Sequence, residues 1–97
     1  MLPVAIEEGL YHIAQEALNN ALKHAHARRV DIHLIAQDNH VRLIVEDDGQ
    51  GFDPRVAHSG GMGLQSMRER AAGLGAKLDI RSTPGAGTRI RLDLAVS

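Results

Sequence analysis

The feature that most limits how this chain can fold is a long run of apolar residues, spaced three and four apart, near its N-terminus. The run comprises Ile6, Leu10, Ile13, Ala14, Ala17, Leu18, Ala21, Leu22 and Ala25. This spacing predicts one amphipathic helix with a single apolar face. Such a face must be covered by a second layer, which the rest of the chain has to supply.

The second layer is predicted to be a β-sheet, because apolar and polar residues alternate in four later stretches. Their apolar members are Val30, Ile32 and Leu34; Val41, Leu43 and Val45; Leu78 and Ile80; and Ile90, Leu92 and Leu94. Turn sequences at 37–40 and 83–87 separate the strands of each pair. A second helix is expected over 64–74. The order predicts an α+β fold, a two-layer α/β sandwich with a mixed, mostly antiparallel sheet and helices on one face.

The bulk properties limit the possible functions. The chain has 97 residues, which predicts a single domain over 1–97. A net charge of -1 and only 2% aromatic residues argue against a nucleic-acid partner. There is no cysteine for a disulfide or a thiolate metal site. Without an apolar run long enough to span a membrane or a recognisable signal peptide, we expect this chain to be cytoplasmic, whereas a longer protein that contains it could be anchored in a membrane.

The predicted first helix carries a polar stripe formed by Glu16, Asn20 and Lys23. At the helical period these side chains fall within an arc of about 60°. An ordinary solvated face would explain them, since most charged residues are exposed. However, asparagine is a poor helix-interior residue, and two occur in succession at Asn19 and Asn20. A hard oxygen ligand for Mg²⁺, with a cation for phosphate one turn further on, would explain one of these asparagines.

Two glycine clusters form the second candidate site. Asp47 precedes Gly49 and Gly51 after a predicted strand, and Gly61 and Gly63 lead into the second helix. A carboxylate beside flexible backbone can accept a hydrogen bond from an exocyclic amine, and a helix N-terminus attracts phosphate. Loops that only need positive φ angles would look the same. The second cluster fits neither a dinucleotide fingerprint nor a Walker A loop, and residues 46–53 lack the ligand spacing and terminal glutamate of a calcium loop.

Taken in order, these segments resemble the ATP-binding catalytic domain of bacterial sensor histidine kinases. "QEALNNALKHAHA" is similar to the N box of that family, and "DDGQGF" to its first glycine box. "GGMGLQSMRERAAGLGAKLDIRSTPGAGT" is similar to its second glycine box and closing hairpin. The wider superfamily, with DNA gyrase and the mismatch-repair ATPases, has the Bergerat ATP-binding fold. The phrase "MRERAAGLGA" points to the nitrate-sensor-like subfamily.

The resemblance implies a role for each matching residue. Asn20 would coordinate Mg²⁺, and Glu16 would assist proton transfer or orient a water as the catalytic residue. Asp47 would accept a hydrogen bond from the adenine amine, directly and through a water shared with Thr88. The remaining ATP-binding residues would be Lys23 and His24 at the phosphates or ribose, Gly49 and Gly51 at the adenine, and Gly61 and Gly63 at the phosphates below a short lid.

The implied function is that of an enzyme module, a protein histidine kinase domain. It would bind Mg-ATP and donate the γ-phosphate to a histidine on a separate dimerisation domain, for signalling to a response regulator. We expect the chain to be a C-terminal fragment of a larger kinase, monomeric and unable to phosphorylate itself. Two alternatives are an anti-sigma-type serine/threonine kinase, which shares the motifs, and a degenerate, non-catalytic interaction domain.

Overall fold

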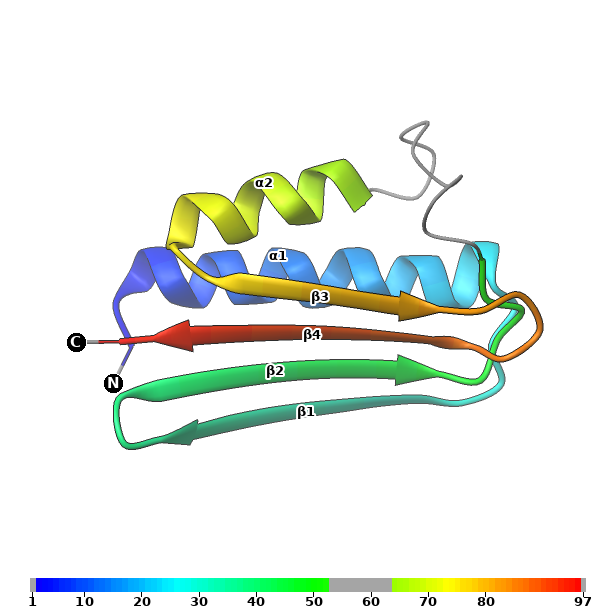
Figure 1. Ribbon diagram of the computed structural model, residues 1–97, viewed down its shortest axis with the longest axis horizontal. Helices are drawn as coiled ribbons and strands as arrows, with labels where there is room; N and C mark the ends of the chain where they lie inside the picture. The colour runs from blue at the N-terminus through cyan, green and yellow to red at the C-terminus, as the bar shows by residue number, and fades with distance from the viewer. Residues whose placement is uncertain (1, 53–63, 97) are drawn as a thin grey trace.

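The computed structural model describes residues 2–52 and 64–96, and its elements follow the predicted order (Figure 1). The first helix is α1, Val4–Asn19, which continues into the π-helical segment η1, Asn20–His24. The second helix is α2, Leu64–Leu74. The strands are β1, Val30–Gln37; β2, His40–Asp47; β3, Lys77–Ser82; and β4, Thr88–Ala95.

The four strands form one sheet in the order β1-β2-β4-β3, and all three pairings are antiparallel. Both helices pack against one face of this sheet, so the molecule has two layers (Figure 1). This confirms the predicted α+β sandwich.

The turn between β1 and β2 explains the register of the first hairpin. Gln37 pairs with His40, which leaves a two-residue loop of Asp38 and Asn39. Their φ angles are 52° and 62°. Positive φ at both central residues is typical of the type I′ turn, whose twist matches that of antiparallel strands. Aspartate and asparagine tolerate this conformation better than most residues, so the sequence of the turn fits its geometry.

The core lies between α1, α2 and the inner face of the central strands. Its largest fully buried side chains are Ile13, Val41, Leu64, Met67 and Leu92. Strand β1 extends beyond the helical layer, so Ile32 and Leu34 remain 48% and 58% exposed although they alternate correctly. The firmly packed part of the sheet is therefore β2 and β4, whose ends at Asp47 and Thr88 form the candidate site.

Candidate functional site

A small cavity lies where the end of the first helix meets the ends of β2 and β4. Three of the polar residues singled out from the sequence, Asn20, Asp47 and Thr88, line this cavity together. The other lining residues are apolar: Ala17, Ala25, Val45, Phe52 and Ile90. Its free volume is about 10 Å³, enough for about one water molecule. The structure thus brings residues from three separate segments to one partly closed pocket.

The last turn before the cavity is a π-helix, where the sequence predicts a continuous α-helix to Ala25. The prediction is wrong for this turn, because the backbone amide of Ala25 donates to the carbonyl of Asn20, five residues earlier, at 2.9 Å. Asn20 is buried, whereas Lys23 and His24 are exposed. Single π-turns inside α-helices are rare and frequent at functional sites.

Asp47 is held at the cavity by its strand and by its own loop. It lies directly opposite Thr88 in the β2–β4 pairing. Its Oδ1 accepts a hydrogen bond from the amide of Gly49 at 2.8 Å. Among the described residues no hydrogen bond reaches Oδ2, so this oxygen remains available to accept from a ligand amine.

Gly49 and Gly51 sit where the chain approaches itself too closely for a side chain. A Cβ on Gly49 would lie 2.5 Å from the Cβ of Ala25 and 2.6 Å from its carbonyl oxygen. Gly51 has φ +67°, and a Cβ there would lie 2.1 Å from the carbonyl oxygen of Thr83. These glycines therefore allow the loop after β2 to pack on the end of the first helix and on the β3–β4 turn.

Asp48 joins the segment after the first helix to the loop after β2. Its Oδ1 accepts from the backbone amides of Arg28 and Arg29 at 2.8 and 2.9 Å. The backbone hydrogen bonds from Arg29 and Arg28 hold the pKa of Asp48 below its usual range. Gln50 adds a backbone bond to the carbonyl of Ala25 at 2.9 Å. The segment after the helix is thus tied to the Asp47 loop from two sides.

Ser82 is a site-adjacent residue that sequence reasoning missed. Its hydroxyl lies 2.8 Å from the hydroxyl of Thr88 and donates to the carbonyl of Gly87 at 3.1 Å. It also accepts from the amide of Phe52 at 2.8 Å. Ser82 therefore fixes the side chain of Thr88 and the backbone of Phe52. Because only the strand register brings these three residues together, no local sequence pattern could have identified Ser82.

The other predicted residues are placed differently. Glu16, one turn before Asn20, is half-buried, and within the described segments neither it nor Lys23 nor His24 lines the cavity. Gly61 and Gly63, with the expected lid, lie outside the described residues. In the described part of the chain, no group of three or more His, Cys, Asp or Glu is placed to hold a metal ion.

The fold and the cavity together define an α+β sandwich domain with its candidate ligand site at the end of the first helix. The chain belongs to the histidine kinase-, DNA gyrase B- and HSP90-like ATPase family, whose profile matches residues 5–97. It is 38% identical over 91 residues to the sensor protein VraS of Staphylococcus epidermidis, and equally to VraS of Staphylococcus aureus. Each match covers 94% of this chain and 26% of the relative.

Solved structures agree with this assignment. The histidine kinase domain of the Erythrobacter litoralis EL346 blue-light activated histidine kinase superposes with a TM-score of 0.83 at 29% identity, over 98% of this chain and 46% of that one. The ATP binding domain of PrrB from Mycobacterium tuberculosis gives 0.76 at 25% identity, over 93% and 68%. The resemblance to sensor histidine kinases is confirmed, while the nitrate-sensor-like subfamily stays a prediction.

The chain spans about a quarter of the length of the curated relatives it matches. Across the described residues, no helix is both long enough and apolar enough to cross a lipid bilayer.

Proposed function

We propose that this domain binds ATP with the adenine in the cavity formed by Asn20, Asp47 and Thr88. The observation that carries the proposal is the convergence of these three residues on one pocket in a chain of this ATPase family. The Oδ2 of Asp47 would accept from the adenine amine, and Thr88 would share a bridging water. The apolar lining residues, such as Val45 and Ile90, would contact the two faces of the ring.

The pocket must open for this to happen, since about 10 Å³ cannot hold a purine. Phe52 is the bulkiest lining side chain and is only half-buried, with its amide bonded to Ser82. It directly follows the glycine-containing segment, which is held in place by its contacts with Ala25 and Thr83, so the ring itself is the part of the lining that can move. Movement of Phe52 is therefore the expected route by which the cavity enlarges to admit the base.

The phosphates would extend from the cavity along the end of the first helix toward the second glycine cluster. Lys23 is exposed at this end and would contact phosphate, with His24 beside the ribose or phosphate. Gly61 and Gly63 would offer backbone amides ahead of α2. The buried amide of Asn20 fits Mg²⁺, which proteins usually hold by one or two oxygens together with substrate phosphates. Bound there, Mg²⁺ would neutralise phosphate charge.

The reaction that fits this site is phosphoryl transfer to a histidine. The γ-phosphate of ATP would pass to a histidine of a separate dimerisation domain, and from there to a response regulator. Glu16, half-buried one turn before Asn20, would accept the proton or orient the attacking group. The similarity to the histidine kinase domain of the Erythrobacter litoralis EL346 kinase, together with that to the sensor protein VraS, supports a histidine acceptor over a serine or threonine. Since ATP is the donor, the proposal also places this domain in the cytoplasm.

Calorimetric titration of Mg-ATP into the wild-type chain and into Asp47→Asn tests the proposal. Loss of a hydrogen bond to a charged group, about 1.5–3 kcal/mol, corresponds to about 10- to 150-fold weaker binding. Asp38→Asn makes the same charge change in the distant β1–β2 turn and should bind like wild type. Asn20→Asp should also weaken binding severely.

Nucleotide choice provides a second readout. Guanine has a carbonyl where adenine has its amine, so it would face the carboxylate of Asp47 with no hydrogen to donate. Wild type should therefore prefer ATP to GTP, and Asp47→Asn should lose much of this preference. Equal binding of Mg-ATP by wild type and both site variants would refute the assignment. Absence of binding at millimolar nucleotide would favour the non-catalytic interaction domain.

A further inference from the structure

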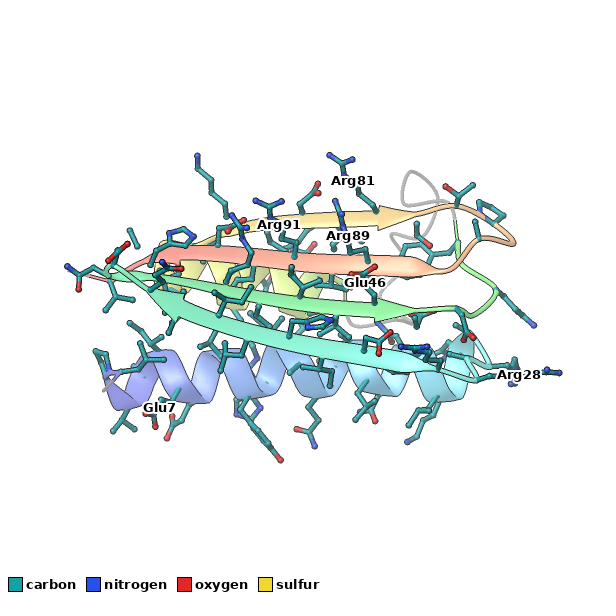
Figure 2. All side chains as sticks on the ribbon, turned by 90° about the horizontal axis from the view of Figure 1, so that it is seen from below. Glu7, Arg28, Glu46, Arg81, Arg89 and Arg91 are labelled. Atoms are coloured by element: carbon teal, nitrogen blue, oxygen red, sulfur yellow. The ribbon has the colours of Figure 1, made fainter. Side chains whose placement is uncertain are left out.

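The face of the sheet that points away from the helices carries charged side chains on β2, β3 and β4. Ile90 and Leu92 are buried toward the helices, so Arg89 and Arg91 alternate to the opposite face. On this face the register aligns Glu46 with Arg89 and Arg89 with Arg81. Figure 2 shows the three labelled side chains in that order across neighbouring strands, with Arg91 close by.

The pairing of Arg81 with Arg89 is unfavourable by itself, because like charges directly opposite each other destabilise a sheet. Arg42 and Arg91 on the same face are neutralised differently, since the Nε of each donates to Asp93 at 2.7 and 2.8 Å. The Nε of Arg89 is shielded from solvent and has no hydrogen-bond partner among the described residues. A shielded guanidinium nitrogen without an acceptor is costly, so this position favours an additional acceptor.

The nearby carboxylates only partly compensate. Asp79 accepts from the Nε of Arg81 at 2.9 Å, in an exposed pair that leaves the terminal nitrogens of Arg81 free to bind elsewhere. Glu46 makes no ion pair with Arg89 within the described residues, although the two are opposite in register.

A surface cavity of about 240 Å³ lies at this point. Arg81 and Arg89 line it with the carboxylates Glu46 and Asp47, and the remaining lining residues are Ser82, Thr83, Ala86, Gly87 and Thr88. Asp47 and Thr88 also line the small cavity at the end of the first helix, so the two cavities are neighbours. Guanidinium groups present planar pairs of N–H donors that match the oxygens of carboxylate and phosphate groups. We propose that this outer arginine pocket binds an oxyanion, a phosphate or a carboxylate group, between Arg81 and Arg89.

The test is a titration of the 97-residue chain with inorganic phosphate at constant ionic strength, followed by NMR of the arginine Nε–H signals. The signals of Arg81 and Arg89 should shift saturably. Arg89→Gln should weaken this binding about 10-fold or more, as expected for loss of a charge-assisted hydrogen bond. Arg89→Lys keeps the charge but loses the planar fork, so it should also bind more weakly.

The matched control is Lys77→Gln, which removes a positive charge from β3 without touching the cavity. It should bind within about two-fold of wild type, because exposed charges a Debye length apart are screened. If Lys77→Gln and Arg89→Gln weaken phosphate equally, or if no saturable shift occurs by tens of millimolar phosphate, the site does not exist. Should Arg89→Gln unfold, Arg81→Gln provides the same comparison.

Phosphate can also enter the nucleotide site, so the titration is repeated with saturating Mg-ATP. Shifts at Arg81 and Arg89 that persist belong to the outer pocket, and shifts that disappear would count against it. A parallel titration with a short glutamate-rich peptide distinguishes a carboxylate of a partner protein from a free anion. Tighter binding of the peptide than of phosphate assigns the pocket to an acidic segment of a partner protein. Binding of phosphate alone assigns it to a free anion.

Discussion

Replacing Gly49 by alanine should destabilise the domain although it adds only one methyl group. The new Cβ would lie 2.5 Å from the Cβ of Ala25 and 2.6 Å from its carbonyl oxygen. Carbon atoms in contact are normally about 3.5–4.0 Å apart, so the two segments must separate by about 1 Å. One of the two obstructing atoms is backbone, so no side-chain rotation relieves the contact.

The magnitude follows from two effects. Forcing an extra methyl group into a packed site costs about 1–3 kcal/mol. Separating the segments also weakens the bond from the amide of Gln50 to the carbonyl of Ala25, now 2.9 Å, which contributes about 1 kcal/mol. We expect a total loss of about 2–3 kcal/mol in the free energy of unfolding.

Urea unfolding followed by circular dichroism measures this loss, with Gly73→Ala as the control. With a slope of about 1–3 kcal/mol per molar urea, the midpoint for Gly49→Ala should fall by about 1 M or more. Gly73 lies inside α2, and a Cβ there meets nothing within 4 Å. Alanine at this position should stabilise the domain by about 0.5–1 kcal/mol.

The same experiment contains its own refutation. If Gly49→Ala and Gly73→Ala shift the midpoint in the same direction, the close contact with Ala25 is not real. A double variant with Ala25→Gly removes the Cβ contact but keeps the carbonyl contact, so it should recover only part of the loss. Full recovery would show that the backbone oxygen does not obstruct the methyl group.

Two further predictions concern Asp93 and Phe52. Partial burial raises the pKa of Asp93, but hydrogen bonds from Arg42 and Arg91 outweigh it and hold that pKa well below its usual range. These hydrogen bonds therefore stabilise the fold fully above the unfolded-state pKa of Asp93, about 3.9, and the stabilisation is lost as the pH falls through the folded-state pKa. Below about pH 5, the urea midpoint of wild type should therefore fall more steeply with decreasing pH than that of Asp93→Asn. Phe52→Ala should lower the unfolding free energy by about 1–3 kcal/mol, less than for a fully buried ring, and should raise the association rate of Mg-ADP in stopped-flow fluorescence with a labelled nucleotide.

The opposite results would be informative. Parallel pH profiles for wild type and Asp93→Asn would mean that the ion pairs of Asp93 do not contribute to folding. An unchanged association rate in Phe52→Ala would mean that its ring does not limit entry to the cavity.

The elements with a regular period could be predicted from the sequence because burial imposes that period. The apolar spacing of the first helix and the alternation in β2 and β4 reflect one buried face each, and α1, β2 and β4 form where expected. Asn20 was selected because asparagine is unusual inside a helix, and Asp47 because a carboxylate beside glycines can accept from a ligand amine; the structure brings both to one cavity. These are features in which local sequence and tertiary packing agree.

The remaining features depend on contacts between distant segments. The apolar spacing gives no sign of the π-turn at Asn20. This turn is followed by residues 25–29, which are bonded to a distant segment: the amide of Gln50 donates to the carbonyl of residue 25, and the carboxylate of Asp48 accepts from the amides of residues 28 and 29. Ser82 acts on Thr88 only because β3 and β4 pair in one particular register. Helix period and strand alternation describe one element at a time, so they cannot report such contacts.

The structure gives a folding reason for Gly49 and Gly51 but none for the negative charge of Asp47. Gly49 and Gly51 are required by the approach of Ala25 and Thr83, so the fold would need them even in a domain that binds no nucleotide. The charge of Asp47 has no such structural reason, because an asparagine Oδ1 could accept equally from the amide of Gly49. The free energy of unfolding of Asp47→Asn should therefore lie within about 0.5 kcal/mol of the wild-type value, as for other substitutions without a packing effect. The variant should nevertheless lose nucleotide affinity. If it loses both together, the carboxylate serves the fold, and the motif no longer distinguishes an ATP-binding domain from a degenerate one.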